Sequence, residues 1–136
     1  MNKPCWSRSK SLVWIPCALL IGLVSCYSSP PGGGPLKSPV VGMALDSPSG
    51  SPSKEAAMKN DEGVSHLKQE HWDTSATFFR EAIAISSNMP EAHFNLALVL
   101  DEMGNHPEAT EHFKTAKELA PNNPKIAENE ILKKHL

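Results

Sequence analysis

Cysteine, aromatic residues and long apolar runs are all scarce in this sequence. Its three cysteines, Cys5, Cys17 and Cys26, all lie near the start of the chain, and aromatic residues make up 6% of it. Disulfides between these cysteines therefore cannot cross-link a domain that begins later in the chain. The longest apolar run, from Leu12 to Val24, has 13 residues. Because a membrane-spanning helix needs roughly 20, this run does not predict a permanent transmembrane segment.

Clustered positive charge is also missing. Arg80 is the one arginine beyond residue 10, and the formal net charge of the whole chain is −2. No basic run and no arginine interleaved with aromatic residues marks a surface for nucleic acid. We therefore predict that nucleic acid is not a partner.

Motifs for catalysis or metal binding are absent from the sequence as well. The six histidines form no pair at i, i+4 and no His-Glu-x-x-His run, and no serine lies in a Gly-x-Ser-x-Gly elbow. Asp101 and Glu102 are adjacent, and adjacent helical residues point apart, so they predict solvated surface rather than a proton-transfer pair. We predict no enzyme activity, no cofactor and no metal, and packed core positions for His66 and His112.

The start of the chain, up to Cys26, predicts an export signal. Lys3, Arg8 and Lys10 precede the apolar run, and no acidic residue accompanies them. The end of the run, Leu23-Val24-Ser25-Cys26, resembles the lipobox of bacterial lipoprotein precursors. That resemblance implies that the Cys26 thiol receives a diacylglyceryl group and that residues 1–25 are removed. The alternative is an ordinary secretory signal that is cleaved between Ser25 and Ser29.

Residues 26–53 are dominated by serine, proline and glycine. Such a composition buries too little apolar surface to offset the entropy of ordering, so it predicts a disordered tether behind the lipidated cysteine. One apolar patch, Val40–Leu45, interrupts it. We interpret this patch as incidental, and the alternative is that it docks on the folded domain or on a partner.

Helix-forming sequence begins after the tether. Ser53 is a candidate N-cap, and Pro90 suits the first position of a later helix. Apolar residues at spacings of three and four predict buried stripes, which include Ile85, Met103 and Leu119. The predicted helices cover residues 54–69, 73–86, 90–103, 107–120 and 124–136.

The second half of the chain contains two copies of one pattern. Phe79 aligns with Phe113 and Ala82 with Ala116 at the same separation, and no gap is needed. This period, about 34 residues with two antiparallel helices per unit, resembles the tetratricopeptide repeat. The resemblance implies an all-α solenoid over residues 54–136, with repeat 1 at about 56–89, repeat 2 at 90–123 and a capping helix at 124–136. The residues that match the family signature are Gly63, Phe79, Ala82, Leu96, Ala97, Gly104, Ala109, Phe113, Ala116 and Pro121.

The resemblance also implies a binding surface on the concave side of the stack. In this family the first helix of each repeat lines that side, which predicts a protein or peptide partner. Phe94 and Leu98 lie off the stripe of their helix, so they are either exposed apolar anchors for a partner or residues that pack against the terminal helix. The predicted partner-binding residues are Asn60, Val64, Leu67, Lys68, Phe94, Leu98, Asp101 and Glu102.

Together these features predict a lipid-anchored, non-catalytic scaffold for protein–protein interaction in the bacterial cell envelope. Its expected location is the outer membrane, facing the periplasm, in a Gram-negative host. The stack is shorter than the three repeats usually needed, so a homodimer is one expected form. Two other functions stay open: a secreted or periplasmic accessory subunit of an enzyme or maturation complex, and a self-assembling structural protein.

Overall fold

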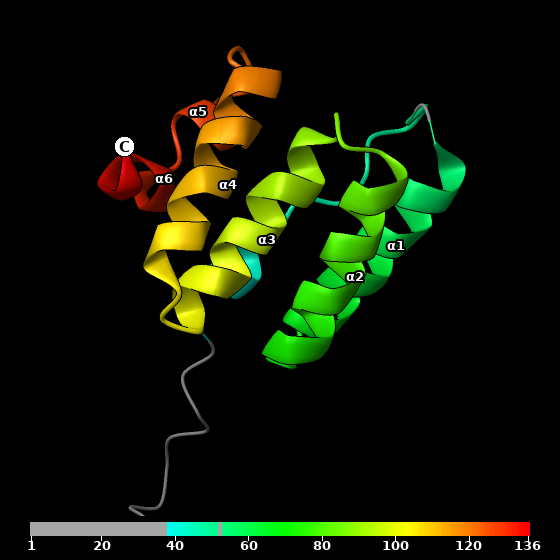
Figure 1. The fold of residues 1–136 in the computed structure, drawn as a ribbon, viewed down its shortest axis with the longest axis horizontal. Helices are drawn as coiled ribbons and strands as arrows, with labels where there is room; N and C mark the ends of the chain where they lie inside the picture. Colours follow the sequence, from blue (N-terminus) through cyan, green and yellow to red (C-terminus); the bar gives the residue numbers. More distant parts are fainter. Residues whose placement is uncertain (1–37, 52) are drawn as a thin grey trace, which may run out of the picture. The chain divides into compact units, whose positions relative to one another are not determined.

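The computed structural model describes residues 38–51 and 53–136. The predicted signal peptide, Cys26 and the first part of the predicted tether lie outside the described residues. Within them the fold is helical and contains no strand, which confirms the predicted all-α class (Figure 1). The elements are a 3-10 helix η1 (Pro39–Gly42) and the α-helices α1 (Lys54–Leu67), α2 (Trp72–Ile85), α3 (Pro90–Glu102), α4 (His106–Leu119), α5 (Pro124–Ala127) and α6 (Glu130–His135).

The first four α-helices form two antiparallel pairs. Helix α1 packs against α2, α2 against α3, and α3 against α4, so successive helices are neighbours (Figure 1). Their bounds agree with the predicted helices to within two residues. The predicted cap at Ser53 is confirmed, because its hydroxyl oxygen accepts a hydrogen bond from the amide of Ala56 at 3.2 Å. Gly104, with a φ of +80°, makes the turn between α3 and α4.

The pairs are held together by a close approach that the repeat signature specifies. A Cβ atom added to Gly63 on α1 would lie 2.5 Å from Cε1 of Phe79 on α2, so only glycine lets the two helices come this near. The Ser75 hydroxyl donates to the Gly63 carbonyl at 2.8 Å across the same contact. Ala97 and Phe113 occupy the corresponding positions one repeat later, and both are fully buried.

Helix α3 is buried on more sides than its stripe predicts. All nine residues from Ala92 to Leu100 are buried. The interpretation of Phe94 and Leu98 as exposed anchors is therefore wrong: both are fully buried, in one core cluster with Leu132 of the terminal segment and with Val40. The physical reason is that α2, α4 and η1 all contact α3, whereas the stripe accounts for one packing face.

The terminal segment differs from the single helix predicted for residues 124–136. It forms two short helices, α5 and α6, separated at Glu128 and Asn129. The Asn129 side chain accepts hydrogen bonds from the amides of Ile131 at 2.9 Å and Leu132 at 3.2 Å, so it starts a new helix instead of continuing the old one. Each helix then contributes one buried apolar residue, Ile126 and Leu132, to the core.

Residues 38–51 also differ from the predicted disordered tether. The patch Val40–Leu45 docks on the helices, with Val40 fully buried and Leu45 nearly so. Docking is the alternative that the composition of this segment left open. Burying two such side chains contributes about 1.5–3 kcal/mol each, which offsets part of the cost of ordering the segment. No helix within residues 38–51 and 53–136 has the length and apolar character needed to cross a membrane.

Candidate functional site

Helices α1 and α3 hold a piece of the chain's own backbone that follows η1 and forms no helix or strand, residues 44–47. We call residues 38–47 the docked segment, and we call Asn60, Asp61 and Asn95 the docking face. The Asn95 side chain grips one residue of the segment twice: its Oδ1 accepts from the Leu45 amide at 2.8 Å, and its Nδ2 donates to the Leu45 carbonyl at 2.7 Å. Both partners are buried, so each hydrogen bond replaces one that water would otherwise supply.

Residues of α1 add further hydrogen bonds to the docked segment. Asn60 Nδ2 donates to the Leu45 carbonyl at 3.1 Å, and Asn60 Oδ1 accepts from Asn95 Nδ2 at 2.9 Å, so the two amides fix each other. Asp61 Oδ1 then accepts from the amide of Ser47 at 2.9 Å. These contacts are made to backbone groups of the segment or to the neighbouring amide, and they fix the path of the chain. Asn60 Nδ2 also donates to the Ser47 hydroxyl at 3.1 Å.

The repeat period matches the period of the segment. Asp61 and Asn95 are one repeat period apart and contact Ser47 and Leu45, which are two residues apart. One further period along the chain, Asn129 Nδ2 lies 3.6 Å from Sδ of Met43. Leu45 and Ser47 lie in the stretch without helix, whereas Met43 has the helical backbone that ends η1. The match of one polar side chain per repeat to every second residue therefore rests on Leu45 and Ser47.

The predicted partner-binding residues fall into different places. Asn60 belongs to the docking face, and Lys68 Nζ lies 3.6 Å from the carboxylate of Asp46 in the docked segment. Val64, Leu67, Phe94 and Leu98 are in the core, Asp101 lies at the far end of α3, and Glu102 is exposed.

Sequence reasoning missed Asp61 and Asn95. Both follow by one position the residues that the family resemblance indicated, Asn60 and Phe94. The signal that could have found them is the polar series Asp61, Asn95 and Asn129, which recurs at the repeat period.

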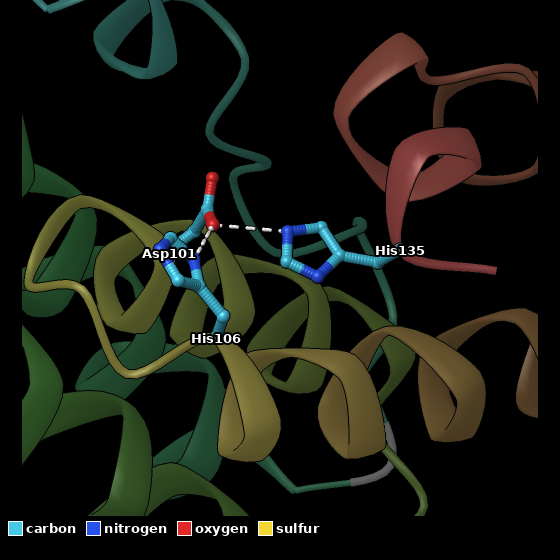
Figure 2. Close-up of side chains that lie close together, drawn as sticks. All are labelled: Asp101, His106 and His135. Atoms are coloured by element: carbon cyan, nitrogen blue, oxygen red, sulfur yellow. Dashed lines mark hydrogen bonds and ion pairs between the residues drawn. The ribbon is translucent and has the colours of Figure 1, made fainter.

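A second cluster lies at the end of α3 (Figure 2). Asp101 Oδ1 is 2.7 Å from Nδ1 of His106, the first residue of α4, and 2.9 Å from Nε2 of His135, the last residue of α6. One ligand-type atom from each residue lies within 4.8 Å of the others. Sequence reasoning saw no metal-ligand pattern here, because the separations of these two histidines from Asp101 match no local motif.

A third polar contact joins the helices of repeat 2. Nδ1 of His93 on α3 lies 3.0 Å from Nδ1 of His112 on α4, and Nε2 of His93 lies 3.0 Å from the carbonyl of Ser87. Because a carbonyl only accepts, His93 donates from Nε2 and accepts at Nδ1 in its neutral form. Burial lowers the pKa of both imidazoles, and for His112 the neighbouring His93 lowers the pKa further.

This pair predicts that the domain loses stability as the pH falls below about 6.5. In the unfolded chain both histidines take up protons near their ordinary pKa of 6.5, whereas the folded chain takes them up only at lower pH. The unfolded state therefore binds more protons in that window, and the equilibrium shifts toward unfolding. Thermal melts on both sides of this pH measure the effect. A double variant, His93→Phe with His112→Phe, should show a smaller fall in melting temperature, and an undiminished fall would assign the effect to other groups.

Comparison with known proteins bears on one part of the chain. Residues 90–123 match the family model of the tetratricopeptide repeat, which is the range predicted for repeat 2. No curated protein and no solved structure matches the chain.

Proposed function

We propose that this chain, a tetratricopeptide repeat protein, binds an extended segment of a partner protein at its docking face and serves as a non-catalytic assembly scaffold. The two-point grip of Asn95 on the backbone of Leu45 carries this proposal. A surface that already holds one extended chain by its amide and carbonyl groups can hold another with the same backbone conformation.

The docked segment indicates what such a partner needs. Leu45 is buried, which favours an apolar side chain at that position. Two residues on, the Ser47 hydroxyl donates to the Ala57 carbonyl at 3.0 Å and accepts from Asn60 Nδ2 at 3.1 Å, which favours a small hydroxyl residue. Between them, Asp46 faces Lys68. The preferred partner is therefore an extended segment with an apolar residue, an acidic residue and serine or threonine in succession.

A partner segment must compete with the docked segment of the same chain. The docked segment is covalently attached, so its effective concentration at the docking face is high, on the order of millimolar for short flexible connections. We therefore infer that the free chain binds peptides weakly and that release of the docked segment strengthens binding.

Competition gives a direct test of the docking face. A labelled peptide with the sequence of residues 38–51 is titrated into three full-length chains: the wild type, Leu45→Asp, and Leu45→Asp combined with Asn95→Ala. The Leu45→Asp chain should bind at least about tenfold more tightly than the wild type, because its own segment no longer competes. The double variant should lose that gain.

A peptide that carries the same Leu45→Asp change is the matched control and should bind none of the three chains. Circular dichroism shows whether each variant keeps its helices. Equal binding of both peptides to a folded Leu45→Asp chain would contradict the proposal.

The finer part of the proposal is a lipid anchor at Cys26 in the bacterial cell envelope, at the outer membrane where the host has one. The basic start, the apolar run and Leu23-Val24-Ser25-Cys26 support it. Fractionation tests the anchor: Cys26→Ala should move the protein out of the membrane fraction, whereas Ser28→Ala should leave it there. A Cys26→Ala protein that stays in the membrane would contradict the anchor and leave the docking face untouched.

The anchor and the docked segment together would set the reach of the domain. With the segment docked, residues 27–37 separate Cys26 from the helices and extend to at most about 40 Å. With the segment released, residues 27–53 extend to at most about 95 Å. Partner binding at the docking face would therefore lengthen the tether.

A further inference from the structure

Asp101, His106 and His135 bring one carboxylate and two imidazoles to one point, from three different elements. Figure 2 shows the Asp101 carboxylate between the two rings, with both dashed contacts ending on the same oxygen. We propose that these three residues bind a divalent transition-metal ion, Zn²⁺ in the first instance, that ties α6 to repeat 2.

The ligand set suits zinc. Two imidazole nitrogens and one carboxylate oxygen are a known zinc ligand combination, with metal–ligand distances of about 2.0–2.2 Å. Two ligands of a tetrahedral ion then lie about 3.3 Å apart. The distances from Asp101 Oδ1 to the two nitrogens are 2.7 and 2.9 Å. Opening each by about half an ångström needs only small side-chain rotations, and His106, whose side chain is 65% exposed, is free to make them.

A neighbouring hydroxyl holds His135 in the form that a metal requires. The Thr110 hydroxyl donates its single proton to the carbonyl of His106 at 2.8 Å, and its oxygen lies 2.9 Å from His135 Nδ1. With that proton committed, Thr110 can only accept, so Nδ1 of His135 carries a hydrogen, and in the neutral ring Nε2 presents a lone pair. Fixing the remote ring nitrogen in this way is how outer contacts orient metal-binding histidines.

Nε2 of His135 lies 2.9 Å from the Asp101 oxygen, so either a proton on Nε2 or a metal ion can join the two groups. The ring is also held in place, because it packs against Phe113 at 5.1 Å between centroids and its side chain is 13% exposed. The site thus has one rigid, largely buried imidazole, one carboxylate and one mobile, exposed imidazole. Three protein ligands leave a fourth position for water or for a side chain of a partner.

The position of the cluster suggests what the ion would do. Helix α6 has six residues and one fully buried side chain, Leu132, which is too little to hold an isolated helix of this length. A metal bridge from its last residue to the α3–α4 turn adds a second attachment at the opposite end. Because such a site is absent from the unfolded chain, the binding free energy stabilises the folded one.

Metal titration of the full chain tests the proposal. The chain is stripped with a chelator, and Zn²⁺ is added at neutral pH in competition with a chromophoric chelator. We expect one site whose affinity falls at least about tenfold in His106→Gln and in Asp101→Asn. His71→Gln is the matched control, because it makes the same change at an exposed histidine outside the cluster and should leave the affinity unchanged.

Cobalt separates this site from the cysteines of the full chain. Co²⁺ bound by thiolates absorbs intensely in the near ultraviolet, whereas Co²⁺ bound by nitrogen and oxygen gives only visible bands. The visible bands should appear in the wild type and in His71→Gln and be lost in His106→Gln. Zn²⁺ should likewise raise the melting temperature of the wild type and of His71→Gln but not that of His106→Gln. The proposal is wrong if the zinc affinity is the same in the wild type and in His106→Gln, a variant that changes a mostly exposed side chain. It is also wrong if the wild-type chain binds no metal.

Discussion

A chain with Leu98→Asp is expected to be unfolded, with a loss of stability on the order of 4 kcal/mol or more. Leu98 is fully buried in the core cluster that α3 shares with its neighbours. An aspartate there would lose the packing of the leucine side chain and place a carboxylate in an apolar environment. Far-ultraviolet circular dichroism and thermal melts measure the loss.

Leu119→Asp is the matched control for this prediction. It makes the same change on α4 at a leucine residue that is 40% exposed, and it should cost no more than about 1 kcal/mol. If the Leu98→Asp chain instead melts cooperatively near the wild-type temperature, this face of α3 is open to solvent.

The contrast between Leu98 and Leu119 shows which part of the fold the sequence predicts. Spacings of three and four residues predict that helices exist and which residues share a face, and all four long helices form as expected. The same spacings do not predict how much of each helix the neighbouring helices cover. Ile85, Met103 and Leu119 lie on predicted stripes, but they are at or just beyond helix ends and are 41%, 45% and 40% exposed.

The docked segment illustrates a second limit. Val40–Leu45 is too short to show a helical or strand period, and its surroundings are rich in turn-forming residues. Its order depends on hydrogen bonds to Asn60 and Asn95, which are 15 and 50 residues from Leu45 along the chain. Local pattern carries no information about such a pairing. The repeat period does, because it places Asp61 and Asn95 in equivalent positions of successive repeats.

The cluster of Asp101, His106 and His135 could not be predicted from the sequence for a similar reason. Asp101 and His106 lie on either side of the Gly104 turn, so their approach follows from the predicted helix pair. His135 joins them only because α5 and α6 fold back on α4, and that path depends on the break at Asn129. A single continuous helix over residues 124–136 would point its end elsewhere. The capping property of one asparagine therefore decides whether three ligand atoms meet.

Asn95→Ala is expected to release the docked segment while the helices stay folded. The alanine removes three buried hydrogen bonds: two to the backbone of Leu45 and one to Asn60. If the segment stayed docked, the Leu45 amide would be buried without a partner, and each such group costs about 1–3 kcal/mol. The burial of Val40 and Leu45 favours docking by a few kcal/mol before the entropy of ordering is subtracted. Losing the hydrogen bonds of Asn95 is therefore enough to make docking unfavourable.

Hydrogen exchange at the Leu45 amide measures this release. Protection should fall at least about tenfold in Asn95→Ala, since each 1.4 kcal/mol is a factor of about ten in the docking equilibrium. Asn122→Ala, at an exposed asparagine in the turn after α4, is the matched control and should leave protection unchanged. Amides in the middle of α1 and α3 should stay protected in both variants, because the helix pairs do not depend on Asn95. If protection at Leu45 is the same in Asn95→Ala as in the wild type, the apolar contacts alone hold the segment, and backbone recognition by the docking face is wrong.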